Sequence, residues 1–276
     1  MADKFMKSIT FVEGGDQYYP LPKVTNADDG KVLKVVDGVW NVTDLIPPLP
    51  YLSFIGNEDF TLKTYNTTKN WDGTLEYSTD TSTWNTWDGT EISSSGSKLY
   101  LRGTGNTKIT GSTSPDNRFV FTGTNALKIA CEGNIENLLD YETVSAGGHP
   151  TMVNYCYEYM FYGCTSLTTA PELPATTLAD YCYNGMFYGC TSLTTAPELP
   201  ATTLASWCYS NMFNGCTKIK LSTTQTGEYQ TTYRIPKSGT GTTATNALTE
   251  MFANTGGTFT GTPSINTTYY TSNTVV

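Results

Sequence analysis

The sequence predicts a mainly β chain with short helices, in which an N-terminal arm and a small β-sandwich precede a stack of 26-residue turns. Only 15% of the residues are charged while Thr, Gly, Ser, Asn and Tyr abound, a balance that favours strands and turns. Hydrophobic residues make up 38% of the chain, which is enough to form a core. The third observation is a repeat, because the twenty residues MFYGCTSLTTAPELPATTLA begin at Met160 and again at Met186.

Residues 1–43 form the predicted arm. VLKVVDGVW within it predicts a small hairpin, since Asp37-Gly38 favours a tight turn between two apolar runs. A segment this short buries too little apolar surface to be stable alone, so we expect it to need a partner. DLIPPLP, residues 44–50, predicts a stiff, extended linker.

Residues 51–124 predict a compact β-sandwich module. Apolar residues alternate in three short runs, as in half-buried strands: Leu75 and Tyr77, Leu99 and Leu101, Phe119 and Phe121. WDGT begins at Trp71 and again at Trp87, and GTGN begins at Gly103. We predict hairpin turns at all three places. Trp84 and Trp87 are secondary candidates for ligand contact.

Residues 125–275 contain the repeats. Three consecutive units share a period of 26, and the third loses its similarity after its second cysteine. The residues that recur are Cys156, Cys182 and Cys208; Met160, Met186 and Met212; Phe161, Phe187 and Phe213; and Cys164, Cys190 and Cys216. We predict that these twelve form the core. Asn125–Val144 and Thr240–Tyr270 are the predicted caps, the second including EMFANTGG, a distant copy that begins at Glu250.

One unit cannot fold alone. Cys156, Met160 and Cys164 are spaced as on one face of a short helix, and Gly163 suits a left-handed residue at its end. SLTTAPELP then predicts a short strand and a turn. One unit offers about five or six large apolar side chains, worth roughly 8–15 kcal/mol of burial. Ordering each of its residues costs about 1–2 kcal/mol, so units must stack to be stable.

The pattern MFxGCTSL…LPATTLAxxCY resembles the leucine-rich repeats of the BspA-like bacterial surface-antigen family. It looks most like the versions in phages and mobile elements of gut Bacteroidetes, including crAss-like phages. This resemblance covers roughly residues 125–275 and implies a leucine-rich-repeat solenoid of 26-residue turns. In the arm, the string PLPxVTxxDxGKVLxVVxGxW resembles the N-terminal arms of phage head-fibre and tail-fibre proteins.

These resemblances imply a structural virion fibre protein that is not an enzyme, with a head fibre favoured. The arm would attach to capsid or other virion proteins through Tyr18, Tyr19, Leu21, Val24, Val32, Leu33, Val35 and Trp40. The repeats would touch bacterial surface glycans or proteins, and the fibre would be a homotrimer. The protein would be made in the host bacterial cytoplasm and reside on the virion surface. Alternatives are a tail fibre or receptor-binding protein, a BspA-like bacterial adhesin, and a glycan-cleaving spike.

Composition excludes several partners. The net charge of −9 disfavours nucleic acid and a polybasic membrane anchor. MADKFMKSITFVEGG lacks the apolar stretch of about 7–15 residues that a secretory signal needs. The sequence also contains no run of about 18 apolar residues, so we expect no membrane insertion. We therefore expect a protein that folds in a cytosol, where its seven cysteines stay mostly as thiols; disulfides between neighbouring turns are the alternative.

Catalytic signals are weak. His149 is the only histidine and no nucleophile-elbow motif accompanies it, so a loop residue is the better interpretation. Glu172 and Glu198 are repeat equivalents and could lie at the separation of glycosidase carboxylates, although the copying of an exposed residue is the better explanation of the pair. The cysteines form no C-x-x-C motif. We expect no metal and no cofactor.

Aromatic residues are the candidate ligand-binding residues. They recur at three positions of the unit, and rows of rings suit sugar stacking or protein contact as well as packing between turns. The three rows are Tyr155, Tyr181 and Trp207; Tyr157, Tyr183 and Tyr209; and Tyr162 and Tyr188.

Overall fold

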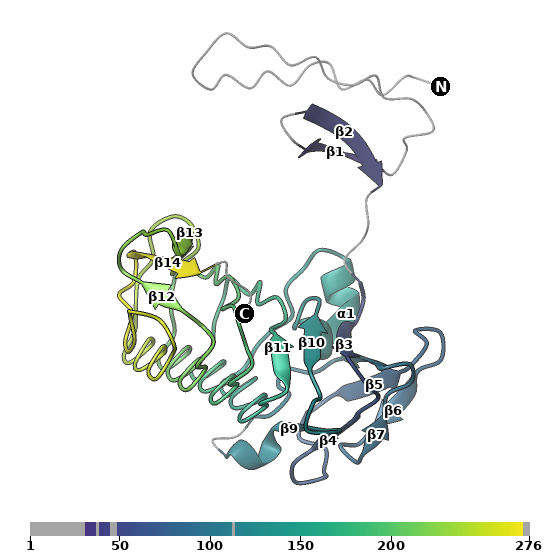
Figure 1. Cartoon of the computed structure of the whole chain (residues 1–276). Helices are drawn as coiled ribbons and strands as arrows, with labels where there is room; N and C mark the ends of the chain where they lie inside the picture. The colour runs from purple at the N-terminus through teal and green to yellow at the C-terminus, as the bar shows by residue number, and fades with distance from the viewer. Residues whose placement is uncertain (1–30, 37–38, 45–48, 112–113, 273–276) are drawn as a thin grey trace, which may run out of the picture. The chain divides into compact units, whose positions relative to one another are not determined.

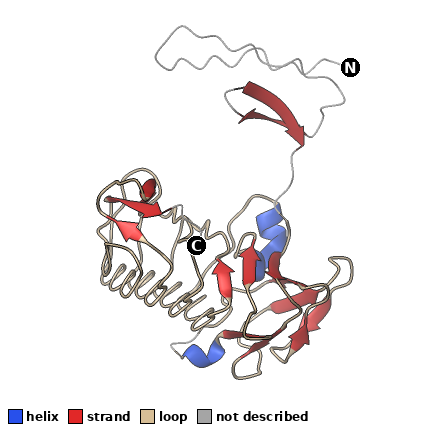
Figure 2. Cartoon of the chain, viewed as in Figure 1, coloured by secondary structure: helices blue, strands red, loops and turns tan. Residues whose placement is uncertain are grey.

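The computed structural model describes residues 31–36, 39–44, 49–111 and 114–272. The chain divides into two compact units, Met1–Pro47 and Pro48–Val276, which are described separately. The described chain is mainly β, with one short α-helix and several antiparallel or mixed sheets, as the composition predicted (Figure 2).

The N-terminal compact unit, Met1–Pro47, contains the predicted hairpin. β1 (Lys31–Val36) pairs antiparallel with β2 (Val39–Asp44), and Val36 lies opposite Val39. Four predicted attachment residues lie on these strands: Val32, Leu33, Val35 and Trp40. The other four fall outside the described residues: Tyr18, Tyr19, Leu21 and Val24.

Two sheets begin the second unit (Figure 1). The six-stranded sheet has the order β11 (Leu167–Thr169), β10 (Ile129–Glu132), β3 (Leu52–Gly56), β8 (Lys98–Thr104), β5 (Thr74–Ser78) and β6 (Asn85–Trp87). Its pairs are antiparallel except for β10 with β11. The three-stranded sheet has the order β7 (Ile92–Ser93), β4 (Thr61–Thr64) and β9 (Phe119–Thr122).

Aromatic rings join these two sheets. Trp87 of β6 packs edge-on against Phe119 of β9, with ring centroids 5.3 Å apart, and Trp71 stacks on Trp87 at 5.0 Å. The three predicted hairpin turns are wrong. Both WDGT segments lead from a strand of one sheet to a strand of the other, and GTGN begins inside β8 and leads away from its sheet. The repeated motif therefore carries the chain between sheets and buries its tryptophans there.

Helix α1 (Asn137–Ser145) packs on β8. A short 3-10 helix, Pro115–Asn117, precedes β9. β10 lies in the predicted N-terminal cap yet pairs with β3 of the module, and β11 comes from the first repeat unit. The six-stranded sheet therefore runs continuously across the predicted boundary at residue 124.

The repeat units contain turns where a helix was expected, and that prediction is wrong (Figure 2). In the first repeat unit, Tyr155, Tyr159 and Gly163 have φ angles of 63°, 55° and 70°. A left-handed residue every fourth position breaks any α-helix. Gly163 has the expected positive φ, but it closes a turn instead of a helix.

We call this run of consecutive four-residue turns the turn ribbon. Backbone hydrogen bonds explain how the turn ribbon of one unit stacks on that of the next. The amides of Tyr157 and Phe161 donate to the carbonyls of Cys182 and Met186 in the next unit, at 2.8 and 2.9 Å. Alternating with these bonds, the amide of Met160 donates within its own unit, to the Tyr157 carbonyl at 3.1 Å. The pattern recurs between the second and third units, so equivalent residues lie one above the next (Figure 1). Alternate amides thus build the turns and join the units.

Both ends of the stack are covered. At the start, Phe119 of the module takes the place of the preceding unit, because its amide donates to the Met160 carbonyl at 2.8 Å. At the other end Phe252 stacks on Phe213, with centroids 5.3 Å apart, so the distant copy at Glu250 forms a fourth layer. A small sheet of β12 (Leu221–Ser222), β14 (Thr268–Ser272) and β13 (Tyr229–Arg234) follows.

Candidate functional site

The first aromatic row lies on the surface of the stack. Tyr155, Tyr181 and Trp207 are half-buried, and each has a positive φ that turns its side chain outward from the cysteine face. Tyr155 stacks on Tyr181 with centroids 4.9 Å apart, and Tyr181 on Trp207 at 5.7 Å. The ring faces inside the row therefore cover one another, and a ligand would meet ring edges and hydroxyls.

Trp207 ends this row. The equivalent position in the next layer is Asn246, which has no ring and shares the positive φ. One face of the Trp207 indole is thus not covered by another ring of the row. Among the three residues it has the best ring for stacking against a sugar.

The second row is buried, which corrects its assignment as a ligand surface. Tyr157, Tyr183 and Tyr209 are at most 1% exposed. Tyr157 stacks on Tyr183 at 5.4 Å, and its hydroxyl donates to the Ile135 carbonyl at 3.2 Å. These rings pack between units, and no ligand in solvent can reach them.

The third aromatic row lies next to the module. Tyr162 and Tyr188 are half-buried and stacked, with centroids 5.1 Å apart. The Arg118 guanidinium lies 5.9 Å from the Tyr162 ring centroid and 3.8 Å from that of Tyr65. This row therefore begins beside a cation of the module.

The predicted core residues are buried in all three units. The most exposed of the twelve is Cys164, at 7%. The second thiol of each unit donates to the carbonyl of a phenylalanine one layer back: Cys164 to Phe119, Cys190 to Phe161 and Cys216 to Phe187, at 3.0–3.3 Å. All seven cysteines are buried, and none forms a disulfide in the structure. Burial raises the pKa of Cys164 and of Cys216 to about 12, which keeps them as thiols.

We expect these thiols to be inert. Iodoacetamide at about pH 8 should alkylate none of the seven in the native protein and all of them in urea, because alkylation needs an accessible thiolate. Intact mass measures the number of adducts. A Thr223→Cys variant, with its new thiol on an exposed loop, should gain one adduct under native conditions. Adducts on the unmodified native chain would contradict the buried arrangement.

A shallow groove brings Glu172 and Glu198 together with His149 and Lys237, in a volume of about 540 Å³. Both glutamates are exposed, and Glu198 forms an ion pair with Lys237. His149 lies on an exposed loop, and its Nδ1 is 2.7 Å from Oε2 of buried Glu136. The groove thus contains an oriented histidine, but its carboxylates lack the desolvated setting that the acid of a glycosidase uses.

A buried acid lies inside the stack. Glu158 is 2% exposed, and its Oε1 accepts a hydrogen bond from Asn184 Nδ2 at 2.8 Å. Oε2 of Glu158 and Oδ1 of Asn184 are buried and have no hydrogen-bond partner among the described residues. Desolvation raises the pKa of Glu158 from its ordinary 4.5 to about 7, and the Asn184 bond opposes that rise.

Glu158 should make stability depend on pH. Between pH 4.5 and about 7 the folded state holds a proton that the unfolded state releases, so its contribution to stability falls as pH rises through this window. A Glu158→Gln variant should be more stable than the parent by roughly 1–3 kcal/mol above that window, and the gain should shrink below it. Urea unfolding at both ends of the window measures this. Glu132→Gln, on the surface, is the control, and a pH-independent gain would contradict the assignment.

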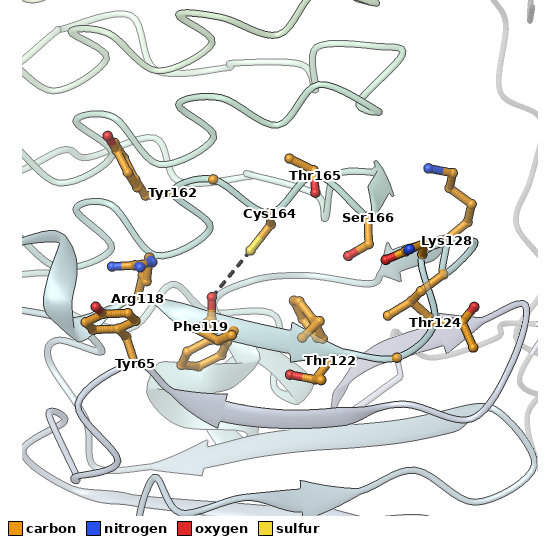
Figure 3. Close-up of a pocket in the computed structure, with 16 residues that line it drawn as sticks. Tyr65, Arg118, Phe119, Thr122, Thr124, Lys128, Tyr162, Cys164, Thr165 and Ser166 are labelled. Carbon is orange, nitrogen blue, oxygen red and sulfur yellow. Dashed lines mark hydrogen bonds between the residues drawn. The ribbon is translucent and has the colours of Figure 1, made fainter.

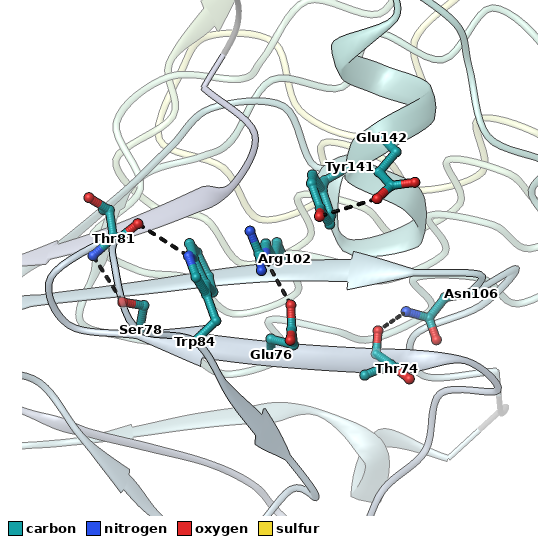
Figure 4. A network of polar contacts seen from close by, with 9 residues as sticks. All are labelled: Thr74, Glu76, Ser78, Thr81, Trp84, Arg102, Asn106, Tyr141 and Glu142. Atoms are coloured by element: carbon teal, nitrogen blue, oxygen red, sulfur yellow. Dashed lines mark hydrogen bonds and ion pairs between the residues drawn. The ribbon is translucent and has the colours of Figure 1, made fainter.

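The module tryptophans differ in exposure. Trp87 is 1% exposed and belongs to the core, so its assignment as a ligand candidate is wrong. Trp84 is half-buried, and the Arg102 guanidinium lies 4.1 Å from its ring centroid and 4.5 Å from that of Tyr141 on α1 (Figure 4). Arg102 also donates to Glu76 at 2.7 Å. This cluster links α1 to the outer face of the sheet.

A second groove contains residues that the sequence did not indicate. Its volume is about 420 Å³, and Tyr65, Arg118 and Lys128 line it together with Tyr162 of the first unit (Figure 3). Arg118 and Lys128 lie ten positions apart on opposite sides of β9, in no motif. Their only sequence signal is that both are cations in an acidic chain.

Among the described residues, no three His, Cys, Asp or Glu side chains cluster as metal ligands would, and no helix has the length and hydropathy to cross a bilayer. No protein-family model, curated protein or solved structure matches the chain.

Proposed function

We propose that this chain is a structural virion fibre protein that displays its stacked units for adhesion to bacterial surface glycans or proteins. The observation that carries the proposal is the half-buried row of Tyr155, Tyr181 and Trp207 on a stack joined by regular backbone hydrogen bonds. Such a stack holds its side chains at fixed spacing, and a fixed surface loses little entropy on binding.

The stack fits a leucine-rich-repeat solenoid of the BspA-like type, which is the finer fold that we propose. Equivalent residues of successive units lie in register and their rings stack from one unit to the next, as in other repeat proteins. The turn ribbon and the two-residue strand β12 would be this chain's own variation on that architecture.

The N-terminal compact unit, Met1–Pro47, would attach the protein to the particle. It is compact by itself and contains the hairpin of β1 and β2. A small unit that needs a partner is suited to docking on capsid or other virion proteins. A head fibre is favoured over a tail fibre, and a homotrimer on the virion surface would add avidity to each weak contact.

Removal of residues 1–43 tests the attachment role. We expect the truncated protein to fold but to be missing from purified particles, as measured by mass spectrometry and by imaging. The full-length protein is the control. Incorporation of the truncated protein would contradict the role given to the first unit, and absence of the full-length protein from particles would contradict the whole proposal.

Adhesion has its own test. Particles carrying Trp207→Ala should bind fewer host bacteria than the parent, because this change removes the ring whose face is uncovered in the row. Lys218→Ala, on an exposed position of the same unit, is the matched control. Equal binding by both particles would remove the aromatic row from the proposal.

A further inference from the structure

A groove beside β9 is lined by residues of both the module and the first repeat unit (Figure 3). β9 is the edge strand of its sheet, and it forms one wall together with the chain that follows it. The turn from Tyr162 to Ser166 forms the opposite wall. The volume of about 420 Å³ is enough for a short, extended ligand.

The charge of this groove is opposite to that of the chain. Arg118 and Lys128 line it at opposite ends, and no Asp or Glu is among the lining residues (Figure 3), although the chain carries 25 acidic and 16 basic residues. Within residues 49–111 and 114–272, neither cation forms an ion pair with a carboxylate. The groove is therefore a local positive site on an acidic protein, which favours an anionic ligand.

Arg118 is held in place before any ligand arrives. Its guanidinium lies 3.8 Å from the ring centroid of Tyr65, and its Nη1 donates to the Pro115 carbonyl at 2.8 Å. These contacts use one of its five N–H donors, so the others can still bind a planar anion such as a carboxylate.

Lys128 and a set of hydroxyls continue the site. Lys128 Nζ donates to Ser192 Oγ at 3.0 Å, which leaves two of its N–H donors for a ligand. Thr122, Thr165 and Ser166 contribute hydroxyls between the two cations (Figure 3). Glu58 lies behind one end of the groove, where it accepts hydrogen bonds from Thr124.

We propose that this groove binds an acidic oligosaccharide, a sugar chain that carries carboxylate or sulfate groups. Two separated cations match a polymer with repeated negative charges, and the hydroxyls between them match sugar hydroxyls. The inference rests on the proposed adhesive function and deepens it by naming a ligand class. A peptide strand that pairs with the edge of β9 is the competing occupant, and it would need neither cation.

The test uses the full-length protein with short oligogalacturonate, measured by isothermal titration calorimetry. Its methyl ester is the matched neutral ligand, and a sulfated oligosaccharide distinguishes sulfate from carboxylate. Arg118→Gln and Lys128→Gln should each weaken binding about tenfold, as expected for the loss of a charge-assisted contact. Lys218→Gln, which removes one positive charge elsewhere, should bind as the parent does. Unchanged thermal unfolding midpoints show that each variant is folded.

The outcomes separate the groove from the wider function. Tight binding of the acidic sugar, with no binding of the ester and weaker binding of both groove variants, supports the proposal. Equal binding of acid and ester overturns it, and so do groove variants that bind the acid normally. Binding of a peptide strand in the groove in place of the sugar would also overturn it. If the acidic sugar does not bind while parent particles still adhere to bacteria, the groove proposal fails and the adhesive function stands. If the sugar binds as described but particles do not adhere, the groove stands and the adhesive function fails.

Discussion

Replacing Phe187, in the second repeat unit, with alanine should lower the free energy of unfolding by about 3–5 kcal/mol, the range seen for buried phenylalanines. Phe187 is fully buried and stacks between two rings, with centroids 5.6 Å from Phe161 and 5.6 Å from Phe213. The smaller side chain would leave a cavity in the middle of the stack and remove both ring contacts at once. Backbone bonds fix the layers above and below, so the site can collapse only slightly.

Urea unfolding, followed by far-ultraviolet circular dichroism, measures this loss. Tyr188→Ala is the control, because this neighbouring ring is half-buried and, among the described residues, stacks on Tyr162 alone. It should cost about 1 kcal/mol, the scale of one partly exposed aromatic contact. Similar losses for the two variants would show that the central rings do not hold the stack together.

Gly103→Ala should destabilise the protein by about 3 kcal/mol or more, at the upper end for overpacked cores. A methyl group on Gly103 would lie 1.7 Å from the carbonyl oxygen of Leu138 in α1. Asn106 Nδ2 donates to that same oxygen at 2.9 Å and to the Thr74 carbonyl at 2.7 Å. The added methyl group would therefore push α1 from β8 and break the bond that ties it to the sheet.

The same chemical change at Gly227 is the control. A methyl group there would meet no atom of the described residues within 4 Å, and the φ angle of Gly227 lies outside the left-handed region. Gly227→Ala should therefore stay within about 0.5 kcal/mol of the parent, as surface changes usually do. Thermal and urea unfolding of both variants compare them, and a stable Gly103→Ala protein would contradict the close approach of α1 to β8.

The sequence predicted the core of the repeats better than their backbone. Cys156, Met160 and Cys164 share an inward face because they are spaced by four residues, and this spacing fits an α-helix and a four-residue turn ribbon equally well. The signal that separates the two is on the other face. Gly185 and Asn211 share their position in the unit, and both residue types favour the positive φ found there.

The ends of the stack and the positive groove could not be predicted. Phe119 substitutes for a repeat unit only because β9 lies against Met160, a contact between segments about forty residues apart along the chain. Arg118 and Tyr162 likewise belong to different segments and meet only in the folded chain. Contacts of this kind depend on how the sheets pack, and local patterns do not encode them.

The regular offset of the bonds between layers has a consequence for how such a chain can change length. Adding or removing one full copy would leave every remaining layer with the same kind of neighbour on each side. Nearly identical tandem copies are also prone to unequal exchange during replication. Reach could therefore vary between related chains in steps of one layer, with the two sheets before the repeats and the sheet of β12, β14 and β13 after them left intact.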